Sequence, residues 1–252
     1  MYVGTATHPV THIVMTSGGV GSFAALDWVC RKHGTGSVIS LFADTHMEDE
    51  DLYRFLSDTH KKLGVRLKVT SDGRNPWKVF SDVKYVGNTR IDPCSRILKR
   101  ELIDSWIREN FSPEQCIVYI GIDWSEKHRF ERLAPRKLPY IYKAPLVDDG
   151  SMFNAEKKIE FCRSFGIEPP RLYSLGFSHN NCGGFCCKAG LAQFKLLFET
   201  MPERYQWHVE RERERSEKRT LTCGRSSEKP STGSLLICGW RIIEISTFCL
   251  SH

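Results

Sequence analysis

The sequence predicts an α/β protein with a mostly parallel, five-stranded sheet and helices on both faces of that sheet. Short apolar runs rich in β-branched residues alternate with stretches of helical periodicity, an order that produces parallel strands joined by crossover helices. A glycine-rich turn joins the first of these runs to the first helical stretch. The runs expected to form strands are residues 12–15, 37–45, 65–70, 117–123 and a short strand closed by Ala144-Pro145-Leu146.

Helices are expected between these strands and after the last of them. Apolar residues recur in these segments at the three- and four-residue spacing of a helix face, and acidic, capping or proline residues mark several of their starts. The segments run from residue 22 onward, from 48 to 63, briefly from 77, from 94 past 103, from 155 to 165, and after 205, where the charges are mixed.

Composition limits the class of protein. A chain of 252 residues can bury one substantial core, and its net charge of +6 suits anionic ligands without by itself indicating nucleic acid. No apolar run approaches the roughly 18 residues of a membrane span, and the N-terminus lacks a signal-peptide pattern. We therefore expect a cytoplasmic protein without a membrane partner. Ten cysteines in such a chain indicate metal or redox chemistry more than disulfides.

The glycine turn is the strongest local signal. It consists of Ser17, Gly18, Gly19, Val20, Gly21 and Ser22, between a strand and a helix expected to begin at Ser22. Such a turn directs backbone N–H groups and a helix N-terminus at one point, and both attract phosphate. A tight turn without a ligand is the alternative. The turn lacks the Gly-Lys-Ser/Thr ending of a Walker A loop and the glycine spacing of a dinucleotide fingerprint.

Two further polar features adjoin the predicted strands and helices. Asp44-Thr45 ends the second strand, at the edge where open α/β sheets bind ligands. Arg96, Lys99 and Arg100 share one helix face at i, i+3 and i+4 spacing. This face is either a solvated surface or an anion site, and its position directly behind Cys94 favours the anion site.

The turn Ser17-Gly18-Gly19-x-x-Ser22 resembles the PP-loop of the ATP pyrophosphatases and sulfonucleotide reductases. The familiar PP-loop has an acidic residue where this chain has Gly21. Three later segments resemble the phosphoadenosine phosphosulfate reductase-like family in the same order. They are Asp44-Thr45 with Glu48, the segment from Gly121 through Glu126 to Arg129, and residues 169–177, which lead into a cysteine cluster. The resemblance covers residues 12–200 and implies a PP-loop, HUP-like fold.

The resemblance also implies ligands and residue roles. ATP with Mg²⁺ is the expected cofactor, its phosphates held by the turn. Asp44 would help to place the adenosine or its magnesium, and Arg129 would steady developing charge; these two are the expected catalytic residues. Asp123 stands where the family often has a basic residue. The expected nucleotide-binding residues are Ser17, Gly18, Gly19, Gly21, Ser22, Asp44, Thr45, Arg96, Arg100, Gly121 and Glu126.

The cysteines are placed unevenly. Cys182, Cys186 and Cys187 lie within six residues, among glycines that let the backbone fold around a metal or cluster. Thiolates ligate both zinc and iron–sulfur clusters. The layout of iron–sulfur members of the superfamily implies that Cys94 joins Cys182 and Cys186, with Cys187 as a fourth ligand. A four-iron cluster, zinc, and redox thiols without metal remain open at this point. Cys30, Cys116 and Cys162 lie in apolar stretches and are expected in the core.

Three functions are compatible with these features. The first is an ATP-dependent transferase that adenylates an acceptor, a nucleobase in nucleic acid or a small molecule, and then transfers sulfur from a donor or another nucleophile. The second is a sulfonucleotide reductase, although Cys249-Leu250-Ser251-His252 has only part of that family's C-terminal motif. The third is a regulatory or defence module that senses ATP without turnover. We expect a nucleotide-binding domain at 1–150, a helical subdomain with the cysteine cluster at 151–216, and a tail at 217–252 that the fold does not require.

Overall fold

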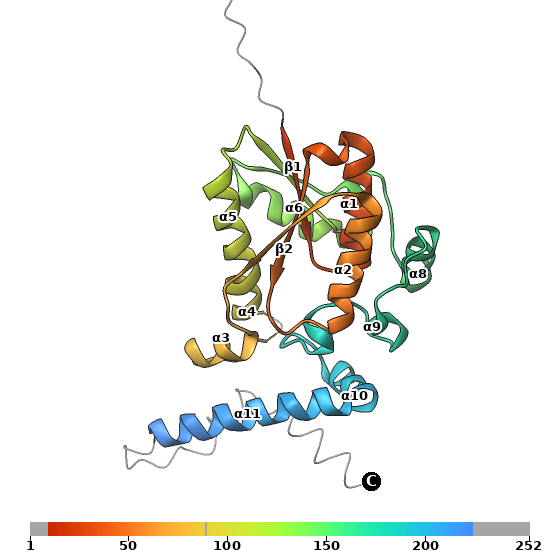
Figure 1. Ribbon diagram of the computed structural model, residues 1–252. Helices are drawn as coiled ribbons and strands as arrows, with labels where there is room; N and C mark the ends of the chain where they lie inside the picture. The colour runs from red at the N-terminus through yellow and green to blue at the C-terminus, as the bar shows by residue number, and fades with distance from the viewer. Residues whose placement is uncertain (1–9, 89, 224–252) are drawn as a thin grey trace, which may run out of the picture.

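In the computed structural model, residues 10–88 and 90–223 are described. They contain one parallel sheet of five strands in the order β3-β2-β1-β4-β5 (Figure 1). The predicted fold class is thereby confirmed. The strands are β1 (Thr11–Thr16), β2 (Val38–Asp44), β3 (Arg66–Ser71), β4 (Cys116–Ile120) and β5 (Ile141–Lys143).

The last two strands end earlier than the sequence suggests. β4 ends at Ile120 instead of Asp123, because the backbone at Gly121 turns to meet the start of the first helix. β5 ends before Ala144, since Pro145 begins a helical turn there. A proline suits the first position of a helix, where its missing N–H has no intrahelical partner to lose.

The helices range from single turns to 22 residues. Within the described residues, no helix combines the length and the apolar character that crossing a membrane requires. The helices are α1 (Val20–His33), α2 (Glu50–Leu63), α3 (Pro76–Asp82), α4 (Pro93–Ser95), α5 (Leu102–Asn110), α6 (Lys127–Leu133), α7 (Pro145–Asp148), α8 (Ala155–Ser164), α9 (Arg171–Ser174), α10 (Leu191–Thr200) and α11 (Pro202–Cys223).

Helices cover both faces of the sheet, as predicted. Val14 of β1 packs with Leu26 of α1 and Tyr119 of β4 on one face. Its neighbour Ile13 lies on the opposite face with Ile103 of α5. Figure 1 shows α1 and α2 on one side of the strands and α5 on the other. Both strand faces are apolar because successive side chains point in opposite directions and each meets a helix.

The helix expected behind Asp92-Pro93 does not have uniform geometry. Residues Arg96–Glu101 form a π-helical segment between α4 and α5. Arg96 consequently pairs with Glu101, five residues later, at 2.7 Å. Lys99 turns inward and pairs with Glu48 at 2.9 Å. The predicted basic face of Arg96, Lys99 and Arg100 is therefore wrong, because π-helical spacing replaces the i, i+3 and i+4 spacing on which it depended.

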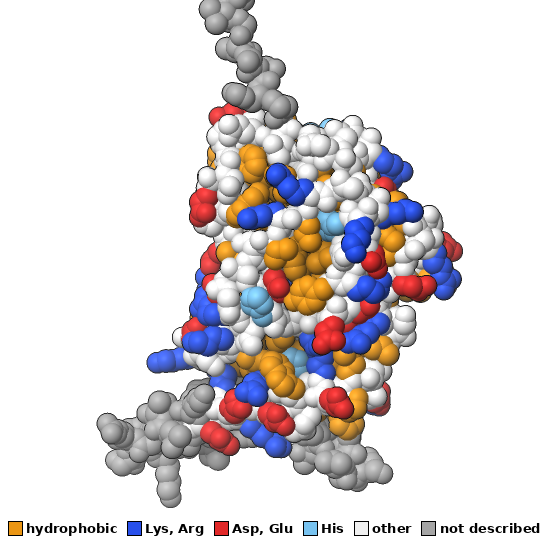
Figure 2. Space-filling view, viewed as in Figure 1, with side chains coloured by type: hydrophobic (Ala, Val, Ile, Leu, Met, Phe, Trp, Pro, Cys, Tyr) orange, Lys and Arg blue, Asp and Glu red, His pale blue; other side chains and the backbone are white. Residues whose placement is uncertain are grey.

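A second layer of helices lies beyond the carboxyl ends of the strands, where α9, α10 and α11 gather (Figure 1). Their apolar side chains form one cluster with Trp77 of α3 and Phe185 of the cysteine segment. Tyr205 and Val209 of α11 are each 1% exposed within it. The outer side of α11 carries acidic and basic side chains next to one another (Figure 2), in keeping with the mixed-charge helix expected after residue 205. The helix continues across the expected boundary at 216 as far as Cys223.

Candidate functional site

A cavity of about 140 Å³ opens beside the glycine turn, at the carboxyl edge of the sheet. The turn and the segment after β4 form one wall, and residues between α7 and the cysteine segment form the other. The lining residues are Ser17, Gly19, Gly21, Ser22, Gly121, Asp123, Glu126, Phe153, Lys158, Tyr173, Ser178, His179, Asn180 and Asn181. The structure thus brings together Ser17, Gly19, Gly21, Ser22, Gly121 and Glu126 of the predicted nucleotide-binding residues.

The turn itself is arranged to receive an anion. Gly19 is the N-cap of α1 and supplies no side-chain hydrogen bond, and the first turn of α1 contains no acidic residue. No side chain of the N-cap residue therefore competes for this helix end, and the helix dipole favours negative charge there. Ser22 Oγ donates to the carbonyl of Gly19 at 2.8 Å and accepts from the amide of Ser17 at 3.2 Å. The hydroxyl thereby holds the two ends of the turn together.

Two glycines allow the backbone to approach closely around the turn. Gly18 has φ +75°, and a Cβ at this position would lie 2.5 Å from Leu52 Cγ. A Cβ at Gly121 would lie 2.6 Å from Ser22 Cα, which is backbone and has no room to move. Gly121 therefore fixes the distance between the segment after β4 and the start of α1. Side chains larger than hydrogen at either position would push the phosphate-binding wall apart.

The opposite wall contains residues that our sequence analysis did not assign to the site. Asn180 is 1% exposed and donates from Nδ2 to the carbonyl of Gly18 at 2.9 Å, while its Oδ1 has no partner in the described structure. The Tyr173 hydroxyl accepts from the amide of Val20 at 3.4 Å. Lys158 Nζ lies 5.2 Å from the centre of the Tyr173 ring. Of these residues, only Tyr173 lies in the segment 169–177 that resembles the reductases, and this resemblance was the signal in the sequence for this wall.

Beneath the cavity, a buried ion pair joins three segments of the chain. Glu48 Oε1 accepts from Lys99 Nζ at 2.9 Å and from Thr45 Oγ1 at 3.0 Å. Glu48 Oε2 accepts from the backbone amide of Cys182. Burial disfavours the ammonium, yet Glu48 and Cys182 hold the pKa of Lys99 above its usual range. The turn after β2, the π-helical segment and the cysteine segment are therefore held at one point.

Asp49, the residue next to Glu48, is also paired. Asp49 accepts from Arg171 Nε at 2.8 Å, and Arg204 donates to the carbonyl of Met47 at 2.7 Å. Asp49 also caps α2 through the amide of Asp51 at 3.0 Å, as its place at a helix start suggests. These pairs tie α9 and α11 to the turn after β2.

Several predicted residues lie outside the cavity. Asp44 Oδ1 accepts from the amide of His46 and the hydroxyl of Tyr53, both at 2.8 Å. Arg129 is paired with Glu126 on the exposed side of α6. Arg100 pairs with Asp92 at 2.7 Å and, like Arg96, faces outward. Asp44, Thr45, Arg96, Arg100 and Arg129 do not line the cavity, so their expected roles remain predictions.

The four cysteines expected to act together do gather. We call Cys94, Cys182, Cys186 and Cys187 the cysteine group. Cys187 Sγ lies 3.7 Å from Cys94 Sγ and also hydrogen-bonds Cys186. The hydrogen bond to Cys187 lowers the pKa of Cys94, and another lowers that of Cys186 to about 6. The same hydrogen bonds raise the pKa of Cys187.

The positions of these sulfurs do not by themselves assign a metal. Among the described residues, no three His, Cys, Asp or Glu side chains are placed to hold one metal ion. Thiolates ligate both zinc and iron–sulfur clusters, so the metal expected at the cysteine group remains a prediction.

Comparison with known protein families identifies the family of this chain. The phosphoadenosine phosphosulfate reductase domain matches residues 11–140, which is more than half of the chain. The chain belongs to this family. The part that matches the reductase domain includes the glycine turn, Glu48, Cys94, Lys99 and Gly121. The second wall of the cavity and the other three cysteines follow it in the chain.

Similarity to solved structures is more distant. An NH₃-dependent NAD synthetase from Campylobacter jejuni, in complex with a nitrate ion, is 13% identical, with 90% of this chain and 91% of that chain covered and a TM-score of 0.42. A protein described as a predicted subunit of tRNA methyltransferase, from Methanocaldococcus jannaschii, is 18% identical, with 64% and 90% covered and a TM-score of 0.37. Neither likeness is close enough to bear on activity. No curated protein matches the chain.

Gly121→Ala tests the close approach between the segment after β4 and the start of α1. The added Cβ would meet Ser22 Cα at 2.6 Å, so we expect a loss of about 1–3 kcal/mol in the free energy of unfolding and weaker ATP binding. Gly36→Ala is the matched control, because a Cβ there meets nothing within 4 Å. Urea unfolding and calorimetry measure the two effects. Equal behaviour of the two variants would contradict the assignment.

Lys99→Met tests the buried ion pair. Removing the ammonium leaves Glu48 buried without its cation, and we expect a loss of about 3–5 kcal/mol. Adding Glu48→Gln to this variant should recover part of that loss, because the remaining side chain is neutral. Lys78→Met, which breaks an exposed pair with Asp82 on α3, should change stability by less than about 1 kcal/mol. Additive effects of the Lys99 and Glu48 substitutions would rule out a coupled pair.

Proposed function

We propose that the protein is an ATP-using transferase of the PP-loop type. It would transfer adenylate from ATP to an acceptor oxygen and release pyrophosphate, after which a nucleophile would displace AMP. The observation that supports this most is the N-terminus of α1, whose N-cap Gly19 has no side chain and which lies with the glycine turn beside a cavity at the carboxyl edge of the sheet. Membership in the phosphoadenosine phosphosulfate reductase domain family agrees with an adenine nucleotide as ligand.

Each wall of the cavity would have its own task. The turn from Ser17 to Ser22 would bind the phosphates through its amides and the dipole of α1. Lys158, whose ammonium also donates to the carbonyl of Ser178 at 3.3 Å, would neutralise phosphate charge from the opposite wall. Asn180 Oδ1, buried without a partner, is a free acceptor for a ligand N–H or O–H. Arg129 and Asp44 would have to reorient toward the cavity to take the catalytic roles that the family suggests.

The cysteine group would supply the second half of the reaction. Cys94, Cys182 and Cys186 would hold an iron–sulfur cluster, with Cys187, whose Sγ lies 3.7 Å from Cys94 Sγ, as a fourth ligand or as a hydrogen-bond partner of the ligands. Such a cluster, when bound, offers a site where sulfide or another nucleophile can be held. The backbone amide of Cys182 donates to Glu48, so the cysteine segment and the turn after β2 are linked at the edge of the sheet where the nucleotide would bind.

Sulfonucleotide reduction is the second candidate, and the family match favours it. The reductases use a cysteine near the C-terminus, and the partial motif at Cys249 lies outside the described residues. A module that binds ATP without turnover is the third candidate, for which Gly21 in place of the acidic residue of the PP-loop leaves room.

Labelled ATP separates the three functions. We expect pyrophosphate release that depends on an added acceptor, tested with unmodified tRNA, DNA and small nucleophile acceptors in turn. Thiol-dependent reduction of adenylyl sulfate would instead identify a reductase, and ATP binding without either reaction would identify a sensor.

Gly19→Val should abolish ATP binding, because its side chain would enter the space between Ser17 and Tyr173. Gly36→Val controls for the substitution itself.

Protein purified without oxygen tests the cysteine group. We expect bound iron, and replacing Cys94, Cys182 or Cys186 with serine should remove most of it. Cys30→Ser and Cys162→Ser are the controls, because these two thiols are buried in core clusters that contain no other cysteine. Metal analysis and absorption spectra provide the measurement. Iron content that is absent, or equal in all five variants, would leave a nucleotide-binding protein with redox thiols.

A further inference from the structure

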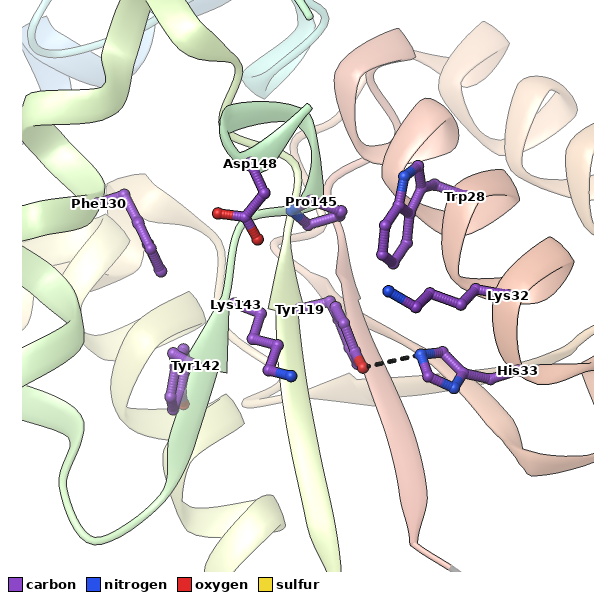
Figure 3. A pocket seen from close by; sticks show the side chains of 9 residues that line it. All are labelled: Trp28, Lys32, His33, Tyr119, Phe130, Tyr142, Lys143, Pro145 and Asp148. Atoms are coloured by element: carbon purple, nitrogen blue, oxygen red, sulfur yellow. Dashed lines mark hydrogen bonds between the residues drawn. The ribbon is translucent and has the colours of Figure 1, made fainter. Parts of the chain in front are cut away.

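A second cavity, of about 240 Å³, lies on the β4–β5 side of the sheet and shares no residue with the cavity at the glycine turn. The last turns of α1 border it on one side, and α6 and α7 border it on the other (Figure 3). We call it the aromatic–basic cavity. Its lining residues are Trp28, Lys32, His33, Tyr119, Phe130, Tyr142, Lys143, Pro145 and Asp148.

Two aromatic rings lie on the α1 side of this cavity. Trp28 comes from α1 and Tyr119 from β4. Phe130 and Tyr142 also line the cavity but belong to the apolar cluster on the α5 face, where the hydroxyl of Tyr142 donates to Asp104 Oδ1 at 3.1 Å. Figure 3 shows Trp28 and Tyr119 on the side of α1, and Phe130 and Tyr142 beyond β5. Trp28 and Tyr119 favour a planar ligand, because rings gain from stacked or edge contacts beyond the area that they bury.

The charges in this cavity are mostly positive and lack partners. The ammonium groups of Lys32 and Lys143 both point toward the shared space (Figure 3). In the described part of the chain, neither forms an ion pair, although eighteen such pairs occur elsewhere in it. Lys32 Nζ instead lies 4.5 Å from the centre of the Trp28 ring. Asp148 is the one acidic side chain of the lining and is likewise unpaired within the described residues.

A stacked pair of histidines adjoins the cavity, of which His33 is a lining residue. His12 is buried and His33 is half-buried, and their rings stack at 3.7 Å between centroids. Tyr119 Oη lies 2.9 Å from His12 Nδ1 and 3.3 Å from His33 Nε2. Burial, with His33 and Lys143, lowers the pKa of His12 to about 4, and burial with the two lysines lowers that of His33. Both shifts favour the neutral imidazoles, and Asp148 is the one carboxylate in the lining of the cavity.

We propose that the aromatic–basic cavity binds an anion that carries a flat aromatic ring. Its anionic group would lie between Lys32 and Lys143, near the Tyr119 hydroxyl, and its ring would pack against Trp28. Asp148 would accept from an N–H or O–H group on the ring. A mononucleotide and a hydroxylated aromatic carboxylate share this chemistry. The two unpaired ammonium groups that face one aromatic-lined space support the proposal, which does not depend on the function of the ATP site.

Calorimetry with the full chain tests this site, with AMP and 4-hydroxybenzoate as probes and with adenosine and inorganic phosphate as their halves. We expect at least one probe to bind more tightly than either half. Lys32→Met combined with Lys143→Met should weaken that binding by about tenfold or more, since each charge-assisted contact contributes over 1 kcal/mol. Lys62→Met is the matched control, because Lys62 lies in the last turn of α2 as Lys32 does in the last turn of α1.

Further readouts separate this proposal from the ATP site. Bound anion should raise the pKa of His33, measured from its ring signals by NMR, because it offsets the field of the two lysines. The double lysine variant should release pyrophosphate at the wild-type rate, and its melting temperature reports whether it folds. The proposal is overturned if no probe binds more tightly than phosphate, or if the double variant and Lys62→Met bind every probe equally. AMP binding that only Gly19→Val removes would belong to the ATP site and would overturn the mononucleotide form.

Discussion

The buried pair between Glu48 and Lys99 is the contact on which the carboxyl edge of the sheet depends. The carboxylate receives the ammonium of the π-helical segment, the hydroxyl of Thr45 and the amide of Cys182. Three segments far apart in the sequence are thereby fixed at one point. A buried carboxylate without such partners would be strongly unfavourable, so the π-helical turn that carries Lys99 inward and the backbone of the cysteine segment are needed together.

The same geometry links the glycine turn to the cysteine group. Asn180 binds the carbonyl of Gly18, and two residues later Cys182 binds Glu48. Residues 180–182 therefore connect the wall of the cavity to the thiols. Arg204 of α11 supports this connection from below, packed so closely on Gly183 that a Cβ there would lie 1.7 Å from its guanidinium.

The acidic residues after β2 illustrate how far sequence reasoning extends. Asp49 was expected to begin a helix, and it caps α2. Glu48 was expected to match the family's glutamate, but its partner Lys99 was placed on a basic outer face. Helical periodicity assumes regular geometry, and a single π-helical segment is enough to turn one side chain of the three inward. Asn180, Lys158 and Tyr173 were missed because a polar residue in a loop, or in a helix whose position relative to the sheet is unknown, gives no sign of what it faces.

By itself, the sequence determined the α/β class, the positions of the five strands to within a few residues, the glycine turn and the set of cysteines that lie near one another. These follow from local physics, because apolar periodicity, glycine and proline constrain the chain within a few residues. Only the tertiary structure decided which charges are buried, how Cys187 lies between Cys94 and Cys186, and that an aromatic–basic cavity forms where α1 meets β4 and β5. Those features depend on contacts between residues that are distant in the sequence, and their energies arise from burial and pairing, which only the packed molecule defines.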